Sequence, residues 1–244
     1  MERGSNSPSI PRAPGAVLAD YRELARSIDQ ATDKIRARHP RDVHCSAGCS
    51  LCCHDFFQVS ILEGAAARIG FEGLPRALKR TVRVRVEALD AELVRRGLGL
   101  SRRRSPREDD DRASGLVYRA REAVAATPLA LCPLNAGGLC AIYPYRPVIC
   151  RTFGFPIDHF FYGCPCGNFE DPDARYLTLD GQRIDRTLEE LASEFVAGTP
   201  LAGRVTDNRY MGVVDWFARL TRRPGSMAGR PSFPPGRAPA SRIP

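Results

Sequence analysis

The sequence predicts a mainly α-helical fold with small β-hairpin elements, in which the helices pack around an irregular cysteine-rich core. Apolar residues recur at three- and four-residue spacing in several segments, which is the pattern of helices with one buried face. Short apolar runs flank two glycine-containing turn signals, and this favours small hairpins. Nine cysteines are concentrated in a few short segments of loop character.

The length of 244 residues is that of one ordinary domain with unstructured ends. Residues 1–15 are rich in Ser, Pro, Gly and Arg and lack apolar periodicity, so we expect a disordered N-terminal tail. Residues 224–244 have the same character and predict a disordered C-terminal tail. A single cysteine-cluster domain is therefore expected over residues 16–223.

The first predicted helix covers residues 16–38, where an apolar stripe runs at helical spacing. Pro40 ends it, because a residue that precedes proline avoids helical geometry. Ser60 and Glu63 then have the spacing of a capping box, in which each side chain accepts from the backbone N–H of the other. They predict a short helix over residues 62–70.

A third, longer helix is expected over residues 74–96, with Val84 among its apolar positions, and a fourth over residues 113–126. Gly137-Gly138 lies between two short apolar runs and predicts a hairpin or knuckle. Pro147 is expected to start a short helical turn that Gly154 ends.

The last part of the predicted domain contains a second hairpin signal and two helices. Asp180-Gly181 lies between alternating residues of the 175–184 segment, which favours a hairpin. Thr187 and Glu190 then have capping-box spacing and predict the start of a helix that stops at Gly198. A final helix is expected over residues 207–223.

The cellular compartment decides how the cysteines are interpreted. No window approaches the roughly 20 apolar residues of a membrane span, and the N-terminus has no apolar signal-peptide core. We therefore expect a cytoplasmic protein that does not enter a membrane. In a reducing compartment clustered cysteines bind metal or carry out redox chemistry more often than they form disulfides. The odd number of cysteines also leaves one thiol unpaired in a monomer.

The net charge of +8 raises the question of nucleic-acid binding. Lysine occurs only at Lys34 and Lys79, and this preference for arginine is typical of coding bias in a GC-rich genome. Within residues 101–112 basic and acidic blocks largely cancel, and much of the remaining excess lies in the predicted tails. Nucleic acid is therefore not expected as a partner.

The cysteine spacing predicts a metal-binding core. Spacings of two or three residues let thiolates from one loop converge on a point, as they do at zinc sites and iron–sulfur clusters. The adjacent Cys52 and Cys53 suggest two neighbouring centres or one bridged centre, because consecutive side chains tend to diverge. Zinc and iron–sulfur clusters both favour four thiolates, so spacing does not separate them. The candidate metal ligands are Cys45, Cys49, Cys52, Cys53, Cys132, Cys140, Cys150 and Cys164.

Other residues beside these cysteines are weaker candidates. His44 and His54 flank the first cluster and are candidate ligands or donors to the ligands. Arg146 and Arg151 flank Cys150, where they either offset thiolate charge or form ordinary surface salt bridges.

Two segments, "CSAGCSLCC" at 45–53 and "CPLNAGGLCAIYPYRPVICR" at 132–151, together with the later Cys164-Pro165, resemble the cysteine-cluster family of zinc- or iron-chelating proteins (YkgJ-type). The resemblance spans about residues 44–166 and implies metal binding without a settled reaction. Cys166 is extra to the family pattern and is kept as a reserve ligand. Some proteins of the family are associated with flagellin lysine methylation.

Three classes of function follow from these observations. The first is a metal-binding protein that coordinates zinc or an iron–sulfur cluster, with its biochemical role unassigned. The second is a SAM-dependent or cluster-dependent protein-modifying enzyme similar to flagellin lysine methylases. Residues 45–52 have the cysteine spacing of radical-SAM enzymes, but predicted helices rather than alternating strands and helices surround them. An ordinary SAM-dependent methyltransferase would show a glycine-rich turn between a strand and a helix, and the sequence has no such turn. The third, a zinc-dependent nucleic-acid binder, requires an ordered basic patch that the sequence does not show.

Overall fold

The structure is a computed structural model that describes residues 11–46, 48–54, 58–95, 131–158, 176–200 and 211–212. In this part of the chain the fold is mainly helical, as predicted, with two small antiparallel two-stranded sheets. The predicted helix over residues 113–126 and the predicted C-terminal tail lie outside the described residues, as do Cys164 and Cys166.

Helix α1 (Pro14–Arg38) confirms the first predicted helix and ends before His39-Pro40. Its start lies within the segment that was expected to be a tail. There the Arg12 guanidinium forms ion pairs with Asp20 and with Glu194, the latter at 2.9 Å. The apolar stripe of α1 is buried as its spacing predicts, through Val17, Leu18, Tyr21, Ala25, Ile28 and Ile35.

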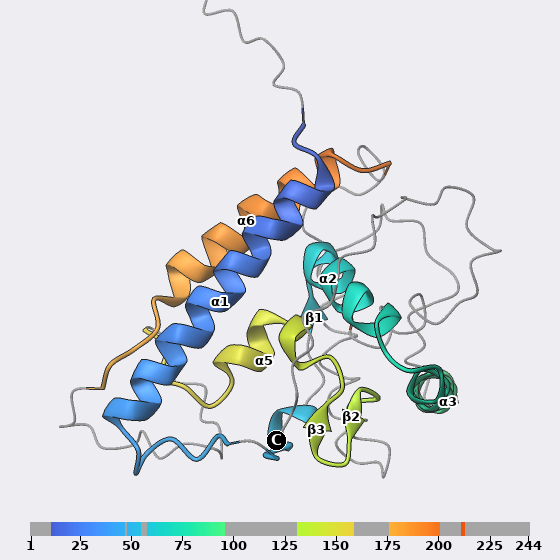
Figure 1. The fold of residues 1–244 in the computed structure, drawn as a ribbon, viewed down its shortest axis with the longest axis horizontal. Helices are drawn as coiled ribbons and strands as arrows, with labels where there is room; N and C mark the ends of the chain where they lie inside the picture. The colour runs from blue at the N-terminus through green and yellow to red at the C-terminus, as the bar shows by residue number, and fades with distance from the viewer. Residues whose placement is uncertain are drawn as a thin grey trace, which may run out of the picture.

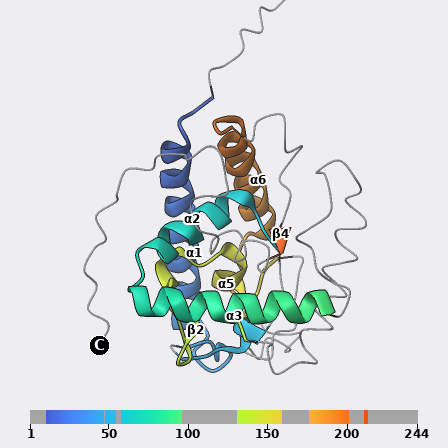
Figure 2. The ribbon, with the colours of Figure 1, turned by 90° about the vertical axis from the view of Figure 1, so that its right-hand side faces the viewer.

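Helix α6 (Gly181–Ala197) lies alongside α1 in both ribbon views (Figures 1 and 2). The predicted hairpin at Asp180-Gly181 is wrong, because Asp180 caps α6 by accepting from the Arg183 N–H at 2.8 Å. Thr187 does not start this helix either, since its hydroxyl donates to the Arg183 carbonyl within the helix. The predicted stop at Gly198 is confirmed.

Helix α2 (Ile61–Glu72) begins with the predicted capping box and runs two residues beyond Gly70. Helix α3 (Arg76–Arg95) follows it within the limits predicted for the third helix. Val84 is the exception to the predicted stripe, because it is exposed on the surface of α3. The buried face of α3 packs instead through Val82 and Val86.

The two sheets are short. Strands β2 (Asn135–Ala136) and β3 (Leu139–Cys140) form the hairpin that Gly137-Gly138 predicts, and both glycines have positive φ, which suits a tight turn. Strand β1 (Gln58–Val59) pairs with β4 (Met211–Gly212), so the helix predicted over residues 207–223 is wrong at these two residues. There the backbone N–H and C=O groups bond across to β1 rather than along a helix.

The short 3-10 helices η1 (Leu51–His54) and η2 (Tyr143–Tyr145) and the helix α5 (Val148–Thr152) complete the described part. The start of α5 after Pro147 is confirmed. Figure 1 places α5 between α1 and the β2–β3 hairpin, and in Figure 2 α3 runs across the view near that hairpin.

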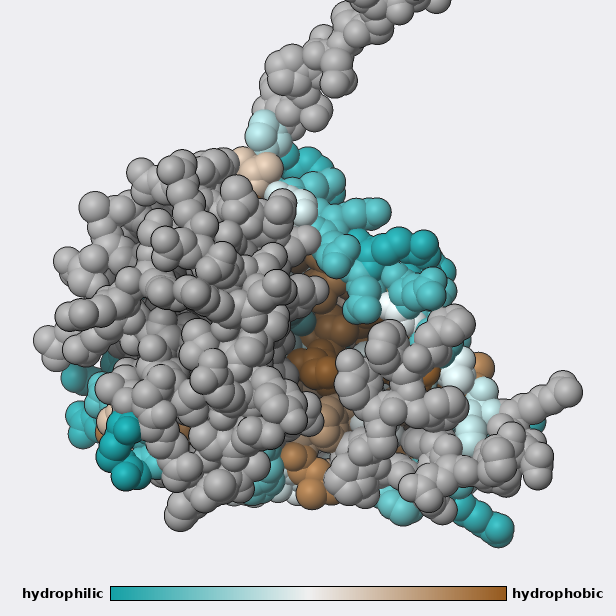
Figure 3. All heavy atoms as spheres, turned by 180° about the vertical axis from the view of Figure 1, so that it is seen from behind, coloured by the Kyte–Doolittle hydropathy of each residue, from teal (hydrophilic) through white to brown (hydrophobic). Residues whose placement is uncertain are grey.

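The core is divided into clusters that frame the cysteine segments. One cluster joins α1, α2, α5 and α6, and another joins α2, α3 and the hairpin, with Cys132 and Cys140 packed against it. Figure 3 shows a strip of apolar side chains on the face seen from behind, beside polar ones. No helix among the described residues is both long enough and apolar enough to cross a membrane.

Candidate functional site

None of the predicted ligands that lie in the described residues forms a disulfide. These seven cysteines are all partly buried: Cys45, Cys49, Cys52, Cys53, Cys132, Cys140 and Cys150. The predicted ligand Cys164 and the reserve ligand Cys166 lie outside the described residues.

Local turns position the first four cysteines. Gly48 has a φ of 89°, and the Cys49 N–H donates to the Ser46 carbonyl at 3.0 Å. The following turn η1 carries Cys52 and Cys53, and the Cys53 N–H donates to Ser50 at 2.9 Å. Cys45 instead packs against the apolar cluster at the end of α1. The loop therefore folds back on itself near that end of the helix.

A backbone hydrogen bond joins the two cysteine regions. The Cys132 N–H donates to the Cys53 carbonyl at 2.6 Å. The adjoining hairpin carries Cys140 opposite Asn135, and its turn approaches the first loop, because a Cβ on Gly138 would lie 3.5 Å from the Gly48 carbonyl oxygen. The structure thus brings together segments that are far apart in the sequence.

The electrostatics of the thiols show that they lie close to one another. Burial, with smaller contributions from charge on Cys53 and Cys140, raises the pKa of Cys132 to about 12 against backbone hydrogen bonds that lower it. Burial also raises the pKa of Cys140, with a further contribution from Cys53. The Cys150 pKa is raised mainly by burial and then by Cys132, Cys140 and Cys53. Thiols from η1, the hairpin and α5 therefore share one environment.

Cys52 and Cys53 interact directly, so the expectation that their side chains diverge is wrong. The Cys52 thiol donates a hydrogen bond to Cys53, which lowers the Cys53 pKa to about 6. The same bond, followed by burial and by charge on Cys150, raises the Cys52 pKa. The two thiols therefore titrate as a pair, in which ionisation of one disfavours ionisation of the other.

The two arginines beside Cys150 belong to a buried network rather than to surface salt bridges. The Arg151 side chain is only 2% exposed and donates to the Asp29 carboxylate, to the Pro144 carbonyl at 2.9 Å and to the Arg146 carbonyl at 3.0 Å. Arg146 donates to the other Asp29 oxygen at 2.6 Å. After burial and other effects, both arginines act to lower the Cys140 pKa. The network ties α5 to α1 and places positive charge beside the thiols.

Glu63 is a second buried connection to α5. Its two carboxylate oxygens accept from the Ser60 N–H at 2.7 Å and from the Val148 N–H at 2.8 Å. Burial raises the Glu63 pKa, and these hydrogen bonds act in the opposite direction. One carboxylate therefore caps the first turn of α2 and holds the first residue of α5.

The two histidines that flank the first cysteine cluster contribute less to the candidate site than the thiols do. His44 and His54 are both exposed. The His44 ring nitrogen lies 3.2 Å from the Arg41 carbonyl oxygen, directed at the backbone. His54 lies near enough to Cys53 for its charge to lower the Cys53 pKa, after the larger effects of Cys52, burial and Asn135.

Sequence reasoning missed two polar side chains beside the thiols. The Tyr21 hydroxyl and the Asn135 amide nitrogen are buried and have no hydrogen-bond partner of good geometry among the described residues. Asn135 nevertheless lies close enough to Cys53 to lower its pKa, and the charge on Cys150 raises the Tyr21 pKa after burial and Glu63 have done so. In the sequence, Tyr21 is indistinguishable from a core residue of a helical stripe.

The thiols gather without forming a complete ligand set. Within the described ranges, no three His, Cys, Asp or Glu side chains stand in an arrangement that could hold a metal ion. The cysteine-rich region is present, whereas its predicted role as a metal-binding core stays a prediction.

Comparison of the chain with protein-family models, with curated proteins and with solved structures gave no match. The resemblance to the cysteine-cluster family therefore also stays a prediction.

Proposed function

We propose that this chain binds a thiophilic metal ion, zinc or iron in an iron–sulfur cluster, through its clustered cysteines. The observation that carries the proposal is the hydrogen bond between the Cys132 N–H and the Cys53 carbonyl, together with the mutual effect of the thiols around it on their pKa values. Structural disulfides would use the same residue type, but none of the described cysteines forms one.

The chemistry of the donor set fits a soft cation. Thiolates are the preferred ligands of zinc and of iron–sulfur clusters, and a bound cation favours deprotonation of the thiols that hold it. In its absence Cys132, Cys140 and Cys150 have raised pKa values, because burial and neighbouring thiolates disfavour their charge. A cation at this point would offset both effects.

Two buried polar groups beside the thiols support the same proposal. A buried donor without an acceptor costs about 1–3 kcal/mol, and among the described residues the Tyr21 hydroxyl is such a donor. The buried Asn135 amide already interacts with Cys53 and lowers its pKa. Thiolate sulfur in a metal site commonly accepts hydrogen bonds from surrounding groups that orient it.

Five thiols form the proposed ligand group, namely Cys52, Cys53, Cys132, Cys140 and Cys150. Cys45 and Cys49 adjoin this group in the first loop, and Cys164 is proposed from the family resemblance alone. Because no three side chains in the described part of the chain are already arranged as ligands, binding by these thiols requires their rotation about χ1.

Anaerobic purification of the full chain, followed by metal analysis and visible absorption, tests the proposal. Iron with acid-labile sulfide and a brown colour indicates a cluster, and colourless protein with stoichiometric zinc indicates a zinc site. Cys53→Ser should lose most of the bound metal, whereas Ser50→Ala in the same loop should retain it. Metal content that is unchanged by Cys53→Ser, or a purified chain that takes up neither metal, contradicts the proposal.

A further inference from the structure

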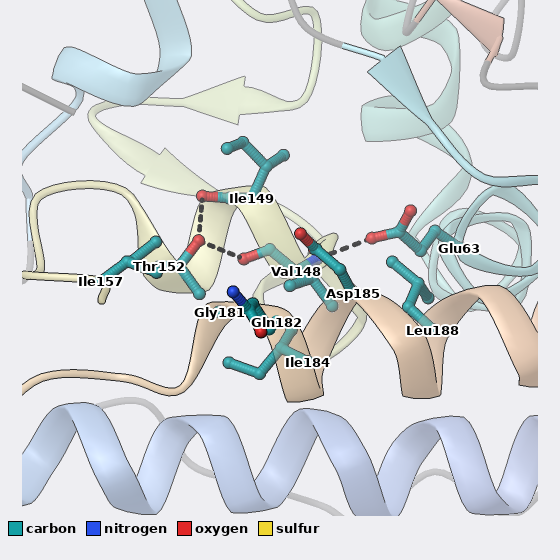
Figure 4. A pocket seen from close by; sticks show the side chains of 10 residues that line it. All are labelled: Glu63, Val148, Ile149, Thr152, Ile157, Gly181, Gln182, Ile184, Asp185 and Leu188. Atoms are coloured by element: carbon teal, nitrogen blue, oxygen red, sulfur yellow. Dashed lines mark hydrogen bonds between the residues drawn. The ribbon is translucent and has the colours of Figure 1, made fainter. Parts of the chain in front are cut away.

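A cavity of about 250 Å³ lies beside α5, and neither Asp29 nor Arg151 is among the residues that line it. It is bounded by α5, by the first turns of α6 and by Glu63 of α2 (Figure 4). The residues that line it are Glu63, Val148, Ile149, Thr152, Ile157, Gly181, Gln182, Ile184, Asp185 and Leu188.

The walls of this cavity are mostly apolar, and the only ionisable side chains among the described residues that line it are acidic. Val148, Ile149, Ile157, Ile184 and Leu188 supply the apolar surface, and no basic residue is among those that line it. Pockets for small molecules usually combine such walls with a few polar groups that fix the orientation of the ligand. The Arg151 guanidinium does not line the cavity, and it donates instead to Asp29 and to two carbonyls.

The two acids differ in their freedom to bind a ligand. Both Glu63 oxygens accept backbone N–H groups, so this carboxylate is committed to the fold. Asp185 makes no hydrogen bond or ion pair with any described residue, and it extends from α6 toward α5 (Figure 4). Asp185 is exposed to solvent at the cavity, and the limited desolvation by its neighbours, followed by the charge of Glu189, raises its pKa. A positive group beside Asp185 would relieve both effects.

We infer that the cavity binds a small ligand in which a compact apolar body carries a protonated amine. The apolar body lies against the isoleucines, and the ammonium group pairs with the Asp185 carboxylate. A cavity of about 150 Å³ accepts one benzene, so by proportion 250 Å³ accepts about ten non-hydrogen atoms. This inference does not depend on what the cysteines bind.

Three probes of similar shape and different charge test the inference: phenethylamine, 2-phenylethanol and phenylacetate. Each is titrated into the full chain labelled with ¹³C at the isoleucine methyl groups. Phenethylamine should bind most tightly and shift the methyl signals of Ile149, Ile157 and Ile184, while those of Ile28 on α1 stay in place. Absence of shifts at the three lining isoleucines with all three probes overturns the inference that this is a binding cavity.

The role of charge is tested by Asp185→Asn, with Glu190→Gln as the control on an exposed part of the same helix that does not line the cavity. Asp185→Asn should weaken phenethylamine binding about two- to fivefold, the range of a partly exposed ion pair, and leave 2-phenylethanol binding unchanged. Glu190→Gln should leave both affinities unchanged. Equal or tighter binding of 2-phenylethanol or phenylacetate to the unmodified chain overturns the assignment of a cationic ligand.

Discussion

Glu63→Gln is the substitution whose effect the structure defines most directly. The Glu63 side chain is buried, and each of its two oxygens accepts one backbone N–H, from Ser60 and from Val148. Glutamine has nearly the same shape, but its NH₂ group replaces one of these acceptors. Either the N-cap N–H of α2 or the first N–H of α5 therefore loses its partner while it stays buried.

The size of the effect follows from the cost of an unsatisfied buried donor, about 1–3 kcal/mol. The neutral amide also removes the cost of burying a carboxylate, so the net loss in unfolding free energy at neutral pH is expected near the lower half of that range. Ser60→Ala removes only the reciprocal bond, in which the Glu63 N–H donates to the Ser60 hydroxyl at 3.2 Å, and should cost about 1 kcal/mol.

The pH dependence has a definite sign. Burial raises the folded-state pKa of Glu63 above its ordinary value of 4.5, so the folded chain binds this proton more tightly than the unfolded chain. The contribution of Glu63 to stability is then complete below about pH 4.5 and falls as the pH rises through the folded-state pKa. Since glutamine does not titrate, the loss caused by Glu63→Gln should be larger at pH 4 than at pH 8.

Urea unfolding followed by circular dichroism between pH 4 and pH 8 measures these differences, with the midpoint as the readout. Glu87→Gln on the exposed face of α3 is the matched control and should change stability by less than about 0.5 kcal/mol. If Glu63→Gln is as stable as Glu87→Gln across this pH range, the two hydrogen bonds from Glu63 do not hold α2 and α5 as described.

Three further predictions follow from the thiol region. Arg151→Met should destabilise the fold by about 1–3 kcal/mol in urea unfolding, because the Pro144 and Arg146 carbonyls lose their donor while the partly exposed Asp29 keeps Arg146 as a partner, and a loss below about 0.5 kcal/mol would contradict the network. In the metal-free chain at pH 7, Cys53 should react with iodoacetamide faster than Cys132, because the Cys53 pKa is about 6 and the Cys132 pKa is about 12. Peptide mass spectrometry measures the two rates, and equal rates would contradict this prediction. Tyr21→Phe should leave the metal-free chain as stable or about 1 kcal/mol more stable, because the hydroxyl has no partner among the described residues, and a loss above 1 kcal/mol would show that a partner exists.

The local elements that the sequence predicts well are those in which neighbouring residues satisfy one another. The Ser60–Glu63 capping box and the Gly137-Gly138 turn each depend on residues within four positions, and both are confirmed. Asp180-Gly181 is the counterexample, since aspartate is favoured both in hairpin turns and at helix N-caps. Packing of α6 against α1 decides between the two, and no local signal contains that packing.

The sequence predicts which cysteines belong to the candidate site, but it does not predict the long-range contacts that hold them in place. Cysteine spacing identifies the thiols, but the pairing of Arg151 with Asp29 joins residues that are 122 positions apart. The same is true of the bond between Glu63 and Val148, since the sequence shows Glu63 only as half of a capping box. Such contacts arise from the assembled fold, so spacing alone cannot reveal them.

The helix α5 shows how these contacts act together. It has only five residues, too few for a helix to be stable by itself, so its position depends on what holds it. Glu63 bonds its first N–H, and Arg151 anchors it to α1 through Asp29. Cys150 faces the other thiols, whereas Ile149 lines the cavity. A group bound on one side of α5 would affect binding on the other side only to the extent that it shifts this helix, and any such effect would be reciprocal in binding free energy.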